Sequence, residues 1–361
     1  MKANLLTLAC LSCVITNALA QTNYRISEAA ANFLVWAPDA RAGGMGHAGT
    51  ATSGDANSAF WNVGKLTDAP GNLGVTASYS PWLPYIMNGA WLGHAAGYKK
   101  LGKGQVIGAS VQYFSDPGIV SAPSLSAGGD IAFSGSYARQ LGNHFSAGIT
   151  LKYLSSDIGS GVVVLGQSLK PARAMAGDIG FYYKSQASDM AGDEHMVWTV
   201  GATIANIGPK MNYGSGYEYF LPTMLRLGGG FSYTANGQHK LNVTAEAGKL
   251  LIPTPQPGRN VNQTPYLEGI VKSFSDAPGG FKEEMQEVTI AMGAEYWYKD
   301  LFALRGGYFT ENKEKGDRKF FTTGAGARIL KHYSLDFAYL IPTDSGSPMK
   351  NMYKLTASVD F

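Results

Sequence analysis

The sequence has few charged residues and no long apolar run, although it is rich in glycine and aromatic residues. Charged residues make up 15% of the 361 residues, against about 25% in ordinary soluble domains. No window approaches the roughly 18 consecutive apolar residues of a membrane-spanning helix, which excludes a helical membrane protein. The aromatic content of 12% argues against disorder. Part of the folded surface must therefore face something other than bulk water.

Cysteine is absent after residue 20, which excludes disulfides and thiol chemistry in the rest of the chain. Cys10 and Cys13 lie in a segment with the features of a secretory signal. It has an apolar core over residues 5–15 and a small-x-small cleavage site at Ala18-Leu19-Ala20. We therefore expect residues 1–20 to be a signal peptide. The formal charge of only +3 gives no reason to expect nucleic acid as a partner.

Motifs for catalysis, metal binding and cofactor binding are missing or out of context. The six histidines are scattered, with no two at i, i+2 or i, i+4, so no metal site is expected. The G-x-S-x-G elbow of hydrolases is also missing. Residues 44–49 match the dinucleotide fingerprint G-x-G-x-x-G, but no strand and helix surround them to give the motif meaning. We expect no cofactor, no catalytic residue and no enzyme activity.

Beyond residue 70 the sequence alternates between apolar and polar residues, which is typical of strands with one buried face. In the last segment, Tyr353, Leu355, Ala357, Val359 and Phe361 alternate with polar residues. The alternating segments are about ten residues long, the length at which a tilted strand crosses a bilayer. The alternation predicts strands over residues 72–80, 88–98, 105–115, 130–140, 145–156, 174–185, 195–207, 223–234, 239–249, 287–299, 301–310, 319–329, 332–341 and 351–361.

The connections between these fourteen strands alternate between short turns and long loops rich in Pro, Gly and Ser. An even number of strands with short turns on one side is typical of outer-membrane barrels. The sequence therefore predicts an all-β fold, a transmembrane 14-stranded antiparallel outer-membrane β-barrel over residues 71–361 with long extracellular loops. A soluble antiparallel sandwich is the alternative, because its strands alternate as well. The short turns are residues 99–104, 141–144, 235–238, 299–300 and 330–331.

Charged residues within the predicted strands favour the barrel. A Lys or Arg on the lipid face at mid-membrane costs about 2–4 kcal/mol, so charges should keep to the polar register. Arg139 has the lipid register, but it lies at a strand end, from where its side chain reaches the interface. The others keep to the polar register: Asp178, Lys184, Arg226, Glu246, Glu295, Arg305, Arg328, Asp336, Lys354 and Asp360.

Residues 21–70 do not alternate, and we interpret them as an internal plug segment. A barrel of fourteen strands encloses a lumen too wide for the wall side chains alone to fill. The segment has an apolar stretch over residues 29–37, followed by a glycine-rich stretch. The plug residues singled out are Pro38, Asp39, Arg41, Gly43, Gly44, Met45, Gly46, Phe60, Trp61 and Asn62.

Three long loops are apolar or aromatic, where a general porin presents polar loops to water. They cover residues 81–87, 217–222 and 250–253. An exposed patch of this kind marks a partner or an apolar ligand; alternatively, the loops pack on one another as a lid. Phe281, Met285 and Val288 have helical spacing and predict a short amphipathic helix in the longest loop. The predicted partner contacts are Trp82, Leu83, Tyr85, Ile86, Met87, Tyr217, Tyr219, Phe220, Leu221 and Phe281.

Several of these segments resemble a known family. Residues 37–46 (APDARAGGMG), 48–52 (AGTAT) and 55–62 (DANSAFWN) resemble the N-terminal hallmark of PorV, the outer-membrane subunit of type IX secretion. Residues 279–284 (GGFKEE) resemble another PorV segment, and PorV is similar to the FadL type of barrel, whose N-terminus forms a plug. Where the family continues Asn-Pro-Ala, this chain has Asn62-Val63-Gly64. Without the fixed φ of proline we expect a looser turn.

The resemblance implies a non-enzymatic carrier in the bacterial outer membrane. A PorV protein receives cargo bearing a C-terminal signal domain from the type IX translocon and presents it to the PorU-type attachment complex, which links it to lipopolysaccharide. Its partners would thus be the translocon, the cargo, that complex and outer-membrane lipid. Two alternatives stay open. One is FadL-like transport of hydrophobic small molecules, and the other is an outer-membrane enzyme acting on lipid A, for which no Ser–His pair is found in the lipid register.

Overall fold

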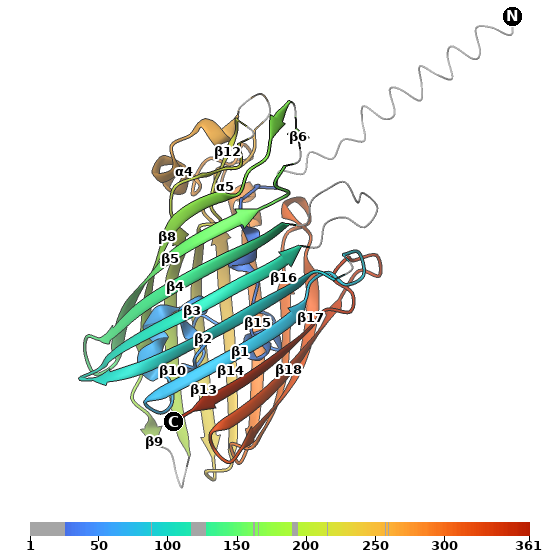
Figure 1. Ribbon diagram of the computed structural model, residues 1–361. Helices are drawn as coiled ribbons and strands as arrows, with labels where there is room; N and C mark the ends of the chain where they lie inside the picture. Colours follow the sequence, from blue (N-terminus) through green and yellow to red (C-terminus); the bar gives the residue numbers. More distant parts are fainter. Residues whose placement is uncertain are drawn as a thin grey trace, which may run out of the picture.

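Fourteen long antiparallel strands form a closed barrel in the described part of the chain (Figure 1). Each strand pairs with its neighbours along the sequence, and β1 closes the ring by pairing with β19, with Val75 opposite Val359. Each predicted strand overlaps one of them, so the predicted fold class is confirmed. They are β1 (Leu73–Pro81), β2 (Trp91–Gly102), β3 (Gln105–Asp116), β4 (Gly128–Gln140), β5 (Phe145–Asp157), β8 (Ala172–Lys184), β10 (His195–Ile207), β13 (Met224–Ala235), β14 (His239–Leu250), β15 (Val288–Tyr298), β16 (Phe302–Thr310), β17 (Lys319–Ile329), β18 (Tyr333–Pro342) and β19 (Tyr353–Asp360).

The structure is a computed structural model, and the expected signal peptide lies outside the residues that it describes. Short strands and helices occupy the loops and the N-terminal part. The described residues are 26–87, 89–116, 128–161, 163–164, 166–189, 194–214, 216–256, 258 and 260–361. The short elements are η1 (Asn32–Val35), α2 (Ala40–Gly43), α3 (Ser58–Trp61), η2 (Val63–Asp68), β6 (Val163–Val164), β7 (Gln167–Ser168), β9 (Ser188–Asp189), β11 (Met211–Asn212), β12 (Glu218–Tyr219), η3 (Val261–Gln263), α4 (Tyr266–Lys272), α5 (Phe281–Gln286) and η4 (Lys313–Lys315).

The two ends of the barrel differ (Figure 1). The loops that carry α4 and α5 lie at one end, which we call the long-loop end. The C-terminus and the short turns lie at the other, the short-turn end, where Lys299 and Leu330 are turn residues. A search of the described residues finds no helix long and apolar enough to span a membrane.

The alternating pattern places apolar side chains outside the barrel and charges inside it. Leu151, Trp198 and Leu304 are exposed on the outer wall, whereas Glu295 and Arg305 are buried in the lumen. An apolar outer wall around a polar interior is the arrangement of a transmembrane barrel and the reverse of a soluble sandwich. The charged residues predicted for the polar register and buried inside are Asp178, Arg226, Glu246, Glu295, Arg305 and Lys354.

The N-terminal segment, residues 26–70, lies against the inner wall. Met45 and Gly46 show how closely, because a Cβ at Gly46 would lie 2.6 Å from the carbonyl oxygens of Met292 and Tyr308. Gly46 also has a φ of 67°, a conformation that favours glycine. The backbone of the segment therefore rests directly on β15 and β16, with no room for a side chain between them.

The turn at Asn62 is fixed without the proline of the family pattern. The Asn62 side chain accepts a hydrogen bond from the Gly64 N–H (3.0 Å) and caps η2. Its Nδ2 donates to the carbonyl oxygens of Thr50 (3.2 Å) and Phe181 (2.8 Å), the latter on the barrel wall. Val63 is buried at the first position of η2, a position that proline also favours. The side chain of Asn62, rather than a fixed φ, holds this turn.

Candidate functional site

Aromatic side chains close part of the long-loop end from inside. Trp36 of the N-terminal segment stacks on Trp82 of the β1–β2 loop, with ring centroids 3.5 Å apart and planes 16° apart. Phe114 of β3 meets both rings edge-on, at 4.9 Å and 6.3 Å. The loop over residues 81–87 therefore packs inward, as in the alternative of a lid, because its Trp82 contacts the N-terminal segment. The buried residues around it include Phe33, Leu34, Leu92, Leu154 and Met211.

Two predicted partner contacts are buried, which corrects the prediction for them. Phe220 is 2% exposed and Leu221 is 1% exposed. The Phe220 ring packs on α4, only 2.7 Å from where a Cβ of Gly269 would lie, and the Phe220 carbonyl accepts a hydrogen bond from Ala30 N–H (2.8 Å). No pattern in the sequence indicates that the N-terminal segment and α4 cover this loop. Trp82, Met87 and Tyr219 are partly buried against the cluster that contains Leu221, and Leu83 is partly buried against Phe320, Leu340 and Met352.

The other predicted contacts are exposed at the long-loop end. Phe281 is 77% exposed, and Met285, one helical turn later, is also exposed. The predicted helix is real but shorter than expected, because α5 ends at Gln286 and Val288 begins β15. We call the exposed rim residues Tyr85, Ile86, Tyr217, Phe281 and Met285.

Buried ion pairs fix α5 to the barrel. Lys249 of β14 binds Glu284 (2.9 Å) and Glu287 (2.6 Å), and Lys315 of η4 binds Glu283 (2.9 Å) and Glu287 (2.8 Å). Burial acts to raise the pKa of Glu287, but the hydrogen bonds from Lys249 and Lys315 outweigh it, so that the pKa lies below its usual value. Glu287 therefore stays ionised. We call Lys249, Glu283, Glu284, Glu287 and Lys315 the loop clamp, because together they join the end of β14, the start of β15 and the loop after β16.

The GGFKEE run contributes two carboxylates to the loop clamp and also contains the exposed Phe281. Gly280 has a φ of 67°, and the chain turns there into α5. Glu283 accepts a hydrogen bond from the Gly279 N–H (2.7 Å), and Glu284 accepts one from the Ala277 N–H (2.8 Å). The two carboxylates thus face inward while Phe281 faces outward. The GGFKEE motif predicted that this segment is important, but it did not predict that Lys249 of β14 and Lys315 of η4 are its partners.

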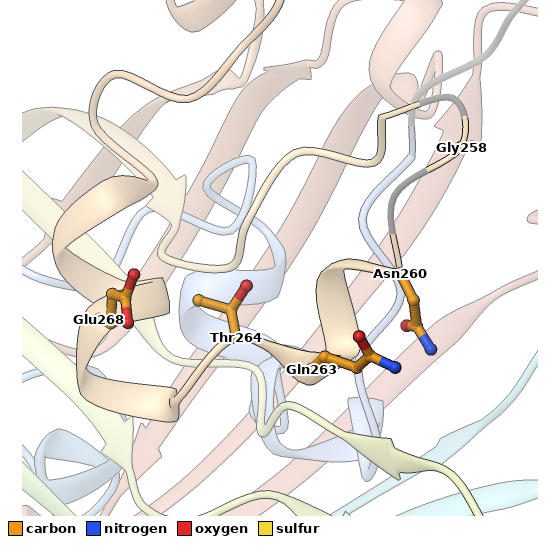
Figure 2. Close-up of a pocket in the computed structure, with 5 residues that line it drawn as sticks. All are labelled: Gly258, Asn260, Gln263, Thr264 and Glu268. Carbon is orange, nitrogen blue, oxygen red and sulfur yellow. The ribbon is translucent and has the colours of Figure 1, made fainter.

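A polar hollow of about 410 Å³ lies in the same long loop (Figure 2). Glu268 comes from α4, and Asn260 caps η3 by accepting a hydrogen bond from the Asn262 N–H (3.1 Å). Such a lining does not suit an apolar ligand. The residues that line it are Gly258, Asn260, Gln263, Thr264 and Glu268.

Ion pairs also tie the N-terminal segment to the inner wall. Arg41 binds Glu295 of β15 (2.9 Å) and Asp55 (3.1 Å). Glu295 binds Arg305 of β16 as well (2.8 Å), and Arg305 binds Asp336 of β18 (2.6 Å). The network therefore joins the segment to three strands, and Arg41 and Asp55 are the charges of the family hallmark that take part in it.

Hydrogen bonds also hold the N-terminal segment, both within the segment and to the barrel wall. Asp39 accepts hydrogen bonds from the Ala42 N–H (2.8 Å) and the Trp61 Nε1–H (2.7 Å). Glu246 of β14 accepts from the N–H groups of Gly49 (2.9 Å) and Thr50 (2.8 Å). The buried plug-motif residues are Pro38, Asp39, Gly43, Gly44, Met45, Gly46, Phe60, Trp61 and Asn62, and Arg41 is nearly so.

Within the described residues, no group of three or more His, Cys, Asp or Glu side chains is placed to hold a metal ion. His94 is buried in the barrel, and His47 is partly buried there. His144, His195, His239 and His332 lie at the short-turn end, as the sequence predicted.

Comparisons with known proteins agree with this geometry. Three solved barrels are similar: the CymD monoaromatic hydrocarbon channel (13% identity, TM-score 0.52, 91% of this chain and 98% of that chain), the P. putida toluene transporter TodX (10%, 0.50, 91% and 99%) and a Pseudomonas aeruginosa FadL homologue (12%, 0.47, 90% and 98%). At these identities the first two show the fold alone. No curated protein matches the chain.

The sequence of the chain also matches a protein family. The family described as "Type IX secretion system protein PorV" matches residues 19–257, which is more than half of the chain. The resemblance of the N-terminal hallmark is thereby confirmed. The chain therefore belongs to the PorV family of type IX secretion, and it is a β-barrel protein of the bacterial outer membrane.

Proposed function

We propose that this protein is a non-enzymatic carrier that binds the C-terminal signal domain of cargo at the type IX translocon. It delivers the cargo to the PorU-type attachment complex, which links it to lipopolysaccharide at the cell surface. In this proposal the long loops are extracellular, residues 21–70 are a plug, and the exposed rim residues contact the partners. Membership of the PorV family supports the secretion role.

The observation that carries the proposal is the exposed Phe281 on a clamped helix. An aromatic ring that is 77% exposed is a candidate anchor for a partner, because a few such side chains dominate most protein interfaces. The loop clamp holds the helix of Phe281 by four ion pairs. Little ordering entropy is then lost when a partner covers the ring.

The interior supports an anchor rather than a passage for hydrophobic molecules. Glu295 lies fully buried between two arginines, and the Lys354 ammonium donates to the Ala37 carbonyl (2.6 Å). Opening the lumen would separate these buried charges, which is costly. We therefore favour secretion over FadL-like transport.

The proposal is tested in a deletion strain. We expect the deletion to retain signal-bearing cargo inside the cell, and the intact gene to restore secretion. The variants Phe281→Glu and Tyr85→Glu should assemble in the outer membrane but fail to restore secretion. Leu330→Glu is the matched control, because Leu330 is also 77% exposed but lies at the short-turn end. Cargo is measured in cells and in the medium by immunoblotting.

Normal secretion by the deletion strain would reject the carrier role. Normal secretion by the Phe281 and Tyr85 variants would reject the rim as the contact surface. Co-purification from detergent extracts should recover a translocon or attachment subunit with the intact protein and less of it with the Phe281 variant. Loss of uptake of hydrophobic substrates, with secretion intact, would instead favour the transporter.

A further inference from the structure

The N-terminal segment covers the inner wall unevenly at the short-turn end, because its α2 packs nearer the middle of the strands, by Gly324 of β17 and Ala338 of β18. Its η2 packs on β3, β4, β5 and β8, where Val106, Ala138 and Tyr182 are buried. On the opposite side, six inward-facing residues of β13, β14, β17 and β18 near the short turns are half-buried. We call these the uncovered sector: Ser232, Thr234, Lys240, Asn242, Arg328 and Ser334.

Two cations in this sector lack an acidic partner. Neither Lys240 nor Arg328 makes an ion pair with a carboxylate of the described residues. Each has a hydroxyl group opposite it in the strand register, Thr234 beside Lys240 and Ser334 beside Arg328. Every one of these four side chains has a hydrogen atom to donate.

Trp297 of β15 lies between the two cations. It is opposite Lys240 in the register, and the Arg328 guanidinium carbon is 5.0 Å from the centroid of its ring. The Arg305 guanidinium carbon is 5.6 Å from the centroid of the same ring. The indole therefore holds the Arg328 side chain in place, so that less freedom is lost when a ligand binds.

Three carboxylates near the sector are already bound by other cations. Glu295 is shared by Arg41 and Arg305, and Asp336 is bound by Arg305. Asp68 at the base of the N-terminal segment is bound by Lys184. Asp300 and Asp360 attract Lys240 and Arg328 from a distance without forming ion pairs with them. The two cations thus lie on the inside of a low-dielectric wall, where a counter-charge is worth more than on an open surface.

We propose that the uncovered sector binds the phosphate group of a small molecule that enters from the short-turn end. A phosphate offers several acceptor oxygens to a surface made of donors, and guanidinium and ammonium groups both bind it well. The proposal does not depend on the carrier role, because the sector lies at the end of the barrel away from the exposed rim residues.

Calorimetry on the purified full-length protein in detergent tests the proposal, with inorganic phosphate and pyrophosphate as probes. We expect saturable binding, tighter for pyrophosphate. Lys240→Met and Arg328→Met should each weaken it by about tenfold or more, as expected for a lost charge-assisted hydrogen bond. Arg328→Lys, which keeps the charge, should restore part of the affinity. Lys331→Met, on an exposed turn at the same end, should leave binding unchanged.

Three results would overturn the proposal. They are no saturable binding of either phosphate probe, tighter binding of glutamate than of pyrophosphate, and equal loss of binding in the Lys331 control. The fold of every variant is checked by the mobility shift of an unheated barrel in gel electrophoresis. If Lys240→Met fails this check, Lys240→Gln takes its place.

Discussion

The N-terminal segment and the loop over residues 251–287 are both held to the barrel by buried ion pairs, but the segment is mostly buried whereas the loop exposes a large aromatic side chain at the long-loop end. Arg41 bound to Glu295 holds the first, and Lys249 bound to Glu284 holds the second. The segment buries its hallmark residues, whereas the loop exposes Phe281. Charges and apolar packing both anchor the segment, because Leu66 also lies in a buried apolar cluster with Tyr98 and Val106 of the wall. In the proposed carrier role, the side chains that the anchored loop leaves exposed contact the partners.

Breaking the anchor of the N-terminal segment should have the largest effect. Glu295→Gln leaves two buried guanidinium groups short of a counter-charge, which costs about 3–5 kcal/mol. We expect a lower midpoint of urea unfolding and cleavage of the segment by protease added to purified protein. Asp317→Asn, in the exposed Lys319–Asp317 pair, is the control and should cost less than about 1 kcal/mol. Equal midpoints for the two variants would contradict this account of the anchor.

Phe220 and Phe281 allow the effect of a buried ring to be compared with that of an exposed ring. Phe220→Ala removes a ring that is 2% exposed and should cost about 3–5 kcal/mol of stability. Phe281→Ala should change stability by less than about 0.5 kcal/mol but reduce secretion of cargo. Unfolding midpoints and cargo immunoblots are measured for both. A large loss of stability with Phe281→Ala would show that this ring packs rather than binds.

Opening the loop clamp should free the loop without unfolding the barrel. Lys249→Met leaves Glu284 without its lysine and removes one of two from Glu287, which costs about 2–3 kcal/mol locally. We expect protease to cut within residues 251–287 and secretion to fall as it does for Phe281→Glu. Because the backbone pairing of the strands is unchanged, the unfolding midpoint of the barrel should stay close to that of the intact protein. Protection of the loop in this variant would mean that apolar packing holds it.

An exposed ion pair of the same loop gives the smallest effect. Lys272 pairs with Glu268 one turn earlier on α4, and both side chains are about half exposed. Lys272→Met should cost only about 0.3–0.5 kcal/mol, with cleavage and secretion unchanged. A result as large as that of Lys249→Met would show that helix α4, rather than the clamp, fixes the loop.

The fourteen strands could be predicted because a strand imposes its period on the sequence. Side chains at every second position share an environment, so residues such as Leu355 and Glu295 reveal their side of the wall locally. The same alternation places the charges in the polar register, and counting the alternating segments gives the even strand number and locates the short turns between them. The PorV hallmark added the family, which the pattern of alternation alone does not give.

The loops and the lumen could not be predicted in this way, because their environment is set by residues far away in the sequence. Phe220 and Phe281 look alike in sequence, but Phe220 is covered by α4 and the N-terminal segment while Phe281 is not. Glu283 and Glu284 become a clamp only through lysines of β14 and η4.

The sequence by itself determined the barrel, the side of the wall on which each strand residue lies, and the family. Only the tertiary structure decided which apolar loop residues are presented and which are packed, and that Lys240 and Arg328 lack an acidic partner among the described residues. The physical reason is that alternation is a local property of a strand, whereas burial in a loop or lumen depends on contacts between segments that are distant along the chain.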